Sequence, residues 1–355
     1  NASVTRPIEV TSETDYTLVF DLQDLLSDRE YFYRGVVLTQ ASPGELVYSP
    51  IGRFRTAPER ATEFRFAWSG DIDARYQPFK LFDRILEMDP HFLILLGDTI
   101  YADLPRERAM RDLIGFRYKH RENRDDPHLQ RLLARTPIFA MWDDHEVEND
   151  FDGTHPQLPE GLRAFREYWP IRSHTPDPTI LYRRHSWGPS TEFFFLDCRQ
   201  YRSPKAAPDG PLKTMLGRLQ KEWFKEAIRS SRAPFKFVVS SVPFLGEWGT
   251  DKWSGYQAER EELLRFFTTE RITGIVILSA DMHAAMELSD PRGFREFVTG
   301  PIAARPLCSI APQLRPRLER TGRPFVCDAF NYGLVTVRPQ ASPPEAEVKV
   351  LDADN

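Results

Sequence analysis

From Phe64 onward, short apolar runs alternate with amphipathic stretches along the chain. Six apolar runs are predicted strands, namely Phe64–Ser69, Phe92–Leu96, Pro137–Trp142, Glu192–Leu196, Phe235–Val239 and Gly274–Ser279. Between them, helical spacing predicts helices over Phe79–Met88, Arg106–His120, His128–Ala134, Lys213–Ser230 and Glu259–Thr268. Near-continuous apolar strands are typical of sheets that are covered on both faces. The alternation therefore predicts an α/β fold.

Residues 1–57 have a different pattern. Short aromatic and β-branched runs predict strands over Tyr16–Phe20, Tyr31–Leu38 and Gly52–Thr56. These strands are too few for a complete sandwich, so we predict a partial or very small β domain. The polar stretch Ala57–Arg60 is the expected linker, which divides the chain into an N-terminal β segment, 1–57, and a second domain, 58–355.

Acidic residues and histidines follow the predicted strands directly. The runs lead into Gly70-Asp71, Gly97-Asp98, Asp143-Asp144-His145, Asp197-Cys198-Arg199 and Asp281-Met282-His283. In α/β folds, ligands bind beyond the carboxyl ends of the strands, so we expect these side chains to share a site. A turn or an acidic helix start would explain any one of them structurally, but their repetition at strand after strand favours a site.

Cations are required if these carboxylates converge. Asp71, Asp98, Asp144 and Asp281 would repel one another when ionised, and desolvating each unpaired carboxylate costs several kcal/mol. Carboxylates with the imidazole of His283 suit Fe³⁺, Mn²⁺, Mg²⁺, Ca²⁺ or Zn²⁺. Two cations a few ångströms apart would clamp a phosphoryl group and activate a hydroxide.

Two nearby motifs need separate interpretation. Tyr101, three residues after Asp98, is either a packed aromatic or a phenolate beside a trivalent cation, which would lower its pKa from about 10. The run His145–Asn149 is similar to the zinc-protease motif HExxH, but Asn149 stands where the second histidine is required, so we exclude that class. The chain also lacks a Walker loop, a dinucleotide glycine motif and a Gly-x-Ser-x-Gly elbow.

Composition and charge exclude further classes. The chain has 355 residues, of which 41% are hydrophobic, and a net charge of −5. No apolar run approaches the ~20 residues that a bilayer requires, so we expect no membrane span. Without an excess of Lys and Arg over Asp and Glu, we expect no specific nucleic-acid binding.

The chain starts at Asn1 and shows no signal sequence. Cys308 and Cys327 would form a disulfide in an exported protein, a pairing that the sequence leaves open.

The motifs occur in a characteristic order. They are Ser69–Asp73, Leu96–Asp103, Trp142–Asp150, Leu196–Arg202 and Leu278–His283, with Ser241–Phe244, Trp253–Arg260 and Glu296–Gly300. As an ordered set over residues 60–340, they resemble the PhoD-type alkaline phosphatases of the calcineurin-like metallophosphoesterase superfamily. The resemblance implies a four-layer α/β/β/α sandwich, preceded by a segment similar to the end of a fibronectin-like domain that is partly missing. It also implies export to the periplasm or the exterior.

The resemblance implies two groups of metal ligands. Asp98 would bridge both metal ions. The ferric group would be completed by Asp71, Tyr101 and His283. The second cation, calcium in this family, would be held by Asp281 with Asp144 or Asn149. Mn²⁺, Mg²⁺ and Zn²⁺ are the alternative metals.

The resemblance also assigns roles outside the ligand set. His145 would act on the leaving oxygen or stabilise the transition state, and Arg199 would clamp the phosphate with paired donors. Asp71 departs from the family, which commonly has a cysteine ligand there, and together with Tyr101 it resembles the ferric site of purple acid phosphatases. Asp73 takes the place of a histidine of the superfamily, so its role is open.

We therefore predict a metal-dependent phosphoesterase. It would hydrolyse phosphomonoesters, phosphodiesters or both by in-line attack of a metal-bound hydroxide. The expected partner is a small-molecule phosphate ester, and the oligomeric state is open. The alternative from another class is a non-catalytic surface module that binds phosphate or glycans.

Overall fold

Two β-sheets form the centre of the protein. The computed structural model describes residues 4–38, 45–172, 175–321 and 325–354. In spatial order, the first sheet contains β16 (Glu345–Asp352), β15 (Asn331–Arg338), β5 (Phe64–Ser69), β6 (Phe92–Leu96) and β7 (Ile138–Met141). The second contains β14 (Phe325–Val326), β12 (Ala285–Ser289), β13 (Arg295–Val298), β11 (Ile275–Ser279), β10 (Phe235–Val239), β9 (Thr191–Phe195) and β8 (Arg183–Trp187).

The central strands of both sheets are parallel. In the first sheet β5, β6 and β7 run in the same direction, and in the second β9, β10, β11 and β13 do so. Their carboxyl ends therefore meet at one edge of each sheet. All six predicted strands are present, with ends that differ from the predictions by no more than one residue.

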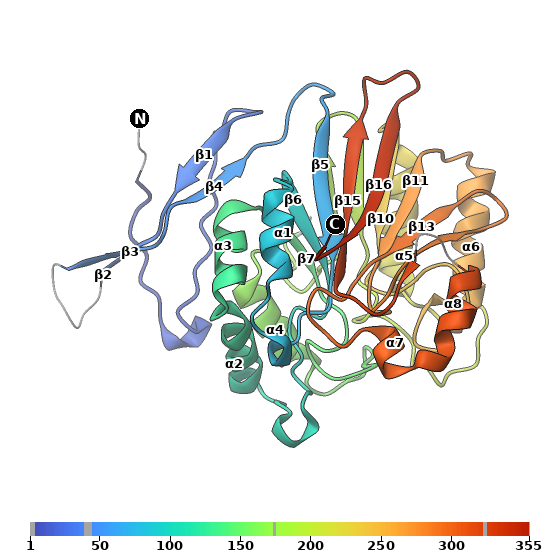
Figure 1. Cartoon of the computed structure of the whole chain (residues 1–355), viewed down its shortest axis with the longest axis horizontal. Coiled ribbons are helices and arrows are strands. Elements are labelled where there is room, and N and C mark those ends of the chain that lie inside the picture. Colours follow the sequence, from blue (N-terminus) through green and yellow to red (C-terminus); the bar gives the residue numbers. More distant parts are fainter. Residues whose placement is uncertain (1–3, 39–44, 173–174, 322–324, 355) are drawn as a thin grey trace.

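Helices cover the outer face of each sheet (Figure 1). Beside the first sheet lie α1 (Leu81–Glu87), α2 (Leu113–Arg124), α3 (Pro127–Arg135) and α4 (Leu158–Tyr168). Beside the second lie α5 (Gly217–Ser230) and α6 (Gln257–Thr269), with α7 (Leu307–Ile310) and α8 (Arg315–Thr321) near its end. The predicted four-layer α/β/β/α fold is confirmed.

Side-chain alternation along β9 explains the layering. Phe193 points into the space between the sheets, where its ring centroid lies 5.0 Å from that of Phe66 on β5. The next residue, Phe194, points the opposite way and lies 6.0 Å from Phe224 of α5. Because successive strand residues point to opposite faces, one aromatic strand contributes to both buried cores.

The helix predictions need corrections. The predicted helix Arg106–His120 begins instead at Leu113, because the Asp112 side chain caps it by accepting a hydrogen bond from Gly115 N at 2.7 Å. The predicted helix Lys213–Ser230 begins at Gly217. Helix α4 is an element that the sequence pattern did not predict. Among the described residues, no helix is both long and apolar enough to cross a membrane.

The N-terminal residues form a narrow ribbon beside α3 (Figure 1). Strand β1 (Glu30–Tyr33) pairs with β4 (Gly52–Arg55), and β2 (Val36–Leu38) pairs with β3 (Leu46–Tyr48), both antiparallel. The predicted strand Tyr16–Phe20 is wrong, because this run is irregular and Tyr16 has a φ of 57°. Neighbouring Asp15 is instead held by Arg121 and Tyr168 on the helical layer.

Candidate metal centre

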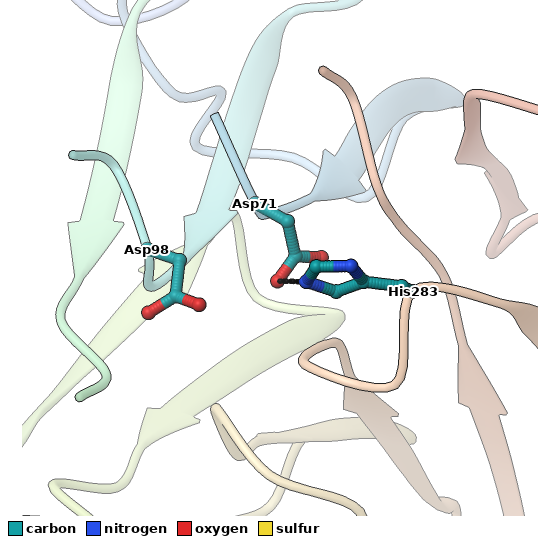
Figure 2. Close-up of side chains that lie close together, drawn as sticks. All are labelled: Asp71, Asp98 and His283. Carbon is teal, nitrogen blue, oxygen red and sulfur yellow. Dashed lines mark ion pairs between the residues drawn. The ribbon is translucent and has the colours of Figure 1, made fainter. Parts of the chain in front are cut away.

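Buried carboxylates converge beyond the carboxyl ends of β5, β6, β7 and β11. Figure 2 shows Asp71 beside His283, with Asp98 directed toward the same space. Ligand atoms of these three residues all lie within 4.8 Å of one another. The two aspartates come from adjacent strands of the first sheet, and His283 comes from the second. Only packing of the two sheets brings this group together.

Tyr101 belongs to the same group. Its hydroxyl lies 2.9 Å from His283 Nε2, and Asp71 Oδ1 lies 3.5 Å from that nitrogen. The other ring nitrogen, Nδ1, lies 2.6 Å from the backbone oxygen of Arg305. This contact orients the imidazole with Nε2 toward the carboxylates, as is usual for a metal-binding histidine.

A second group overlaps the first. Asp98, Asp144 and His145 place ligand atoms within 4.8 Å of one another, and so do Asp143, Asp144 and Asp281. Asp144 is buried, whereas Asn149 is exposed. The choice between Asp144 and Asn149 as a ligand of the second cation stays a prediction.

Two observations indicate that these side chains are suited to bind cations. Asp71 Oδ2 and Asp144 Oδ1 are buried and accept no hydrogen bond, which is costly for a carboxylate unless a cation neutralises it. Asp71, Asp98, Asp281 and His283 have φ angles of 64°, 49°, 67° and 51°, in the left-handed region that non-glycine residues rarely adopt. Such strain clusters at functional sites, where the surrounding structure holds it in place.

The electrostatics of the protein groups agree with this fit. Burial, followed by the charge of Asp144, raises the pKa of Asp98 well above its ordinary value. Burial also raises the pKa of Asp281 to about 8. These shifts measure how strongly the chain alone disfavours so many negative charges in one place. A bound cation would reverse them, because it is then the largest local charge.

The loops that carry these ligands are held together by Glu146. Its buried carboxylate accepts hydrogen bonds from the backbone N–H groups of Asp98 at 3.1 Å, Thr99 at 2.7 Å and Asp143 at 2.9 Å. The loops approach so closely that a Cβ on Gly97 would lie 2.4 Å from Asp143 Cβ. Glu146 therefore fixes the loop after β6 to the loop after β7.

His145 lies at the edge of the centre. Its Nδ1 is 2.6 Å from Asp103 Oδ1, and its ring stacks on Tyr101 with centroids 4.2 Å apart. Burial lowers the pKa of His145, but the charges of Asp144 and Asp103 outweigh burial and raise it to about 9. Asp103 and Tyr101 thus fix the orientation of the imidazole.

The structure does not support the predicted phosphate clamp at Arg199. The side chain is fully buried, and each of its three guanidinium nitrogens donates to a carboxylate, either Asp143 or Asp251. No paired donors remain for a phosphate. Arg199 instead neutralises the acidic residues beneath the centre. Asp73 is likewise engaged, since it accepts two hydrogen bonds from Arg75 Nε at 3.0 and 2.8 Å.

Sequence reasoning missed three residues at the site. Asp103 lies two positions after the candidate ligand Tyr101, and this proximity in the sequence could have identified it. Asp251 and Lys252 lie in the long loop after β10, where the Lys252 ammonium pairs with Asp281. Neither residue directly follows a strand, so no pattern in the sequence pointed to them.

The disulfide between Cys308 and Cys327, which the sequence left open, is formed, and Cys198 is buried and free.

Comparisons with known proteins agree with this geometry. The family model described as PhoD-like phosphatase matches residues 68–321. Alkaline phosphatase D of Bacillus subtilis is 28% identical over 287 residues, which are 67% of this chain and 49% of the relative. The chain thus spans about half the length of the curated relative that it matches.

Solved structures share the fold. A structure of PhoD superposes with a TM-score of 0.76 at 22% identity, covering 92% of this chain and 76% of that one. A purple acid phosphatase from yellow lupin (Lupinus luteus) seeds has a TM-score of 0.64 at 14% identity, covering 94% of this chain and 59% of that one. The family model covers most of the chain, including every strand end that carries a candidate ligand. The chain therefore belongs to the PhoD-like phosphatase family.

Proposed function

We propose that this protein is a metal-dependent phosphoesterase that hydrolyses phosphomonoesters, phosphodiesters or both. Two overlapping groups that share Asp98 carry this proposal: Asp71 and His283 lie in the first and Asp144 in the second. Membership of a phosphatase family supports it. The alternative of a non-catalytic binding module is not favoured.

The ligand groups divide by geometry. Asp98 contributes to both groups and would bridge two cations, while Asp71, Tyr101 and His283 would complete the first. Asp144 and Asp281 would hold the second. Oxygen donors with one imidazole suit Fe³⁺ with Ca²⁺, the pair that we propose. When bound, such a pair neutralises the phosphoryl oxygens and activates water as the nucleophile.

His145 is the proposed proton donor to the leaving oxygen. Asp103 holds its Nδ1, so the proton for transfer is held at Nε2. The carboxylate of Asp103 favours the protonated imidazole, as a proton donor requires. Stacking on Tyr101 fixes the plane of the ring.

A hydrolysis assay tests the proposal. Wild type would be assayed on paired monoester and diester substrates, with and without chelator, alongside metal analysis. Asp98→Asn removes a bridging charge and should lower kcat by at least about 100-fold and reduce the metal content. Asp152→Asn, in a half-buried turn outside the candidate ligand groups, is the matched control and should leave both kcat and metal content unchanged. Undiminished hydrolysis by Asp98→Asn would contradict the proposal.

We further propose an exported protein. The Cys308–Cys327 disulfide supports this location, because disulfides persist mainly in oxidising compartments.

A further inference from the structure

An ammonium group lies among the carboxylates of the second ligand group. Lys252 Nζ forms an ion pair with Asp281 and lies 3.4 Å from Asp251 Oδ2. The Lys252 side chain is only 14% exposed and that of Asp281 8% exposed. Lysine is seldom buried unless it is paired, and here the ammonium neutralises the carboxylate of Asp281.

The backbone on both sides of Lys252 is firmly anchored. Asp251, just before it, is paired with Arg199 and Arg202. Trp253, just after it, is fully buried and donates a hydrogen bond from Nε1 to Ser240 Oγ at 3.2 Å. The main chain therefore has little freedom, whereas the four-carbon side chain of lysine is flexible. The ammonium of Lys252 can therefore change position while the backbone of this residue stays fixed.

The two carboxylates near the ammonium depend on it to different degrees. Asp251 already has two guanidinium partners, so it stays neutralised without Lys252. Among the described residues, the one ion pair of Asp281 is with Lys252. Asp281 is also a candidate ligand of the second cation. A cation bound by Asp281 would therefore release the ammonium within reach of the same space.

The site otherwise lacks its predicted phosphate-binding cation. Arg199 is fully buried, and its guanidinium is committed to Asp143 and Asp251. Lysine is a common phosphate ligand that acts as a point charge. The guanidinium of Arg199 is fixed by carboxylates that are not proposed cation ligands, whereas Lys252 is paired with Asp281, which a cation would take over.

We propose that Lys252 is the phosphate-binding residue of the site, released from Asp281 when a divalent cation takes over that carboxylate. The ligand is a phosphoryl oxygen of a phosphate ester or of inorganic phosphate. This proposal rests on the proposed phosphoesterase function. It predicts two opposite effects of removing the ammonium, since Lys252 competes with the cation but attracts the phosphate.

The test uses Lys252→Met, which keeps an unbranched side chain of four heavy atoms and removes the ammonium group. Titration calorimetry with Mn²⁺ should show the second cation binding about tenfold tighter than in wild type, because no ammonium competes for Asp281. With both cations supplied, inorganic phosphate should bind at least about tenfold more weakly. A merely structural lysine would not shift the two affinities in opposite directions.

Controls separate this proposal from the general function. Lys225→Met removes an ion pair with Glu262 away from the site and should change neither affinity. Lys252→Arg retains a positive charge and should bind phosphate within about threefold of wild type, provided that melting curves show it folded. Unchanged or weaker Mn²⁺ binding, or unchanged phosphate binding, in Lys252→Met overturns the proposal. Absence of hydrolysis in wild type would refute the proposed function, while the Mn²⁺ titration would still test Lys252.

Discussion

Gly300 lies directly against a candidate metal ligand. Its φ is 116°, and a Cβ at this position would lie 2.3 Å from Asp71 Oδ2. The Asp71 side chain is buried, so it has little space to move away. A side chain at position 300 would therefore displace the carboxylate itself.

We expect Gly300→Ala to impair metal binding specifically. Displacing Asp71 should lower the affinity for the first cation by at least about tenfold, a loss of about 1.4 kcal/mol. Gly293→Ala is the matched control, because Gly293 also has a positive φ, 95°, but nothing lies within 4 Å of its Cβ position. Both variants should lose stability through backbone strain. Equal metal content in the two purified variants would contradict the steric argument.

Glu296 is a buried titrating residue outside the ligand set. Its carboxylate accepts hydrogen bonds from Phe244 N at 2.7 Å, Leu245 N at 2.5 Å and Ser279 Oγ at 2.6 Å. Burial raises its pKa from 4.5 to about 7, although these donors favour the charged form. The native pKa lies above the unfolded one, so the associated stability is present below pH 4.5 and is lost as the pH rises through about 7.

Urea unfolding across this pH range tests the prediction. Between about pH 5 and about pH 8, wild type should lose on the order of 2 kcal/mol more than Glu296→Gln, which does not titrate. The variant should also be less stable at both pH values, because an amide cannot accept from all three donors. Parallel pH profiles for the two proteins would show that Glu296 does not titrate in this range.

At the scale of elements, the segment around α7 supports His283. Arg305 O contacts Nδ1 of the histidine, and Leu307 N donates to His283 O at 2.8 Å. The disulfide ties Cys308 to Cys327 across 19 positions of sequence, and Cys308 N donates to Cys327 O at 2.7 Å. One crosslink thus restrains the segment that orients a candidate ligand.

Reduction of the disulfide should loosen this support. We expect Cys308→Ser with Cys327→Ser to lower the free energy of unfolding by about 3 kcal/mol, the value for a loop of this size. The first cation should also dissociate faster, as measured by chelator competition. Cys198→Ser, at the free buried cysteine, is the control and should not affect dissociation of the metal. Identical dissociation rates in wild type and the double variant would refute the supporting role.

At the scale of the whole molecule, the N-terminal segment is attached peripherally. Arg117 Nη1 donates to Ser12 O at 3.4 Å, and β4 packs beside α3. A surface pocket of about 500 Å³ separates Leu18 and Val19 on one side from Leu162 of α4 on the other. The buried cores, in contrast, begin at Phe64. We therefore propose residues 58–355 as the catalytic domain.

Deletion of residues 1–57 tests this division. The deletion removes hydrogen bonds of Arg117, Arg163 and Tyr168 and ion pairs of Arg121, Arg172 and Asp89. At about 1 kcal/mol for each hydrogen bond, the free energy of unfolding should fall by several kcal/mol. Hydrolysis should stay within about twofold of the full chain, because no candidate ligand belongs to the deleted part. Circular dichroism and the ester assay would measure the two effects. A deletion variant that fails to fold would show that the segment is an integral part of the domain.

Local pattern was sufficient to predict much of this protein. Each parallel strand is a continuous apolar run, and its ligand follows in the next few residues, so covalent adjacency placed Asp71, Asp98, Asp144 and His283 at a common edge. Elements without a strong period, such as the irregular run Tyr16–Phe20, were predicted incorrectly. There the contacts of exposed residues with distant helices outweigh local propensity.

Only the tertiary structure decided what each charged residue does. Sequence alone determined the α/β alternation of strands and helices and the acidic strand ends, because hydrophobic period and chain adjacency are local properties. Burial is not a local property. In the folded chain Asp144 is buried whereas Asn149 is exposed, and buried Arg199 pairs with Asp143 and Asp251. The pairing of Lys252 with Asp281 joins two loops of the second sheet. Charges act through space, so their partners become known only when the chain is folded.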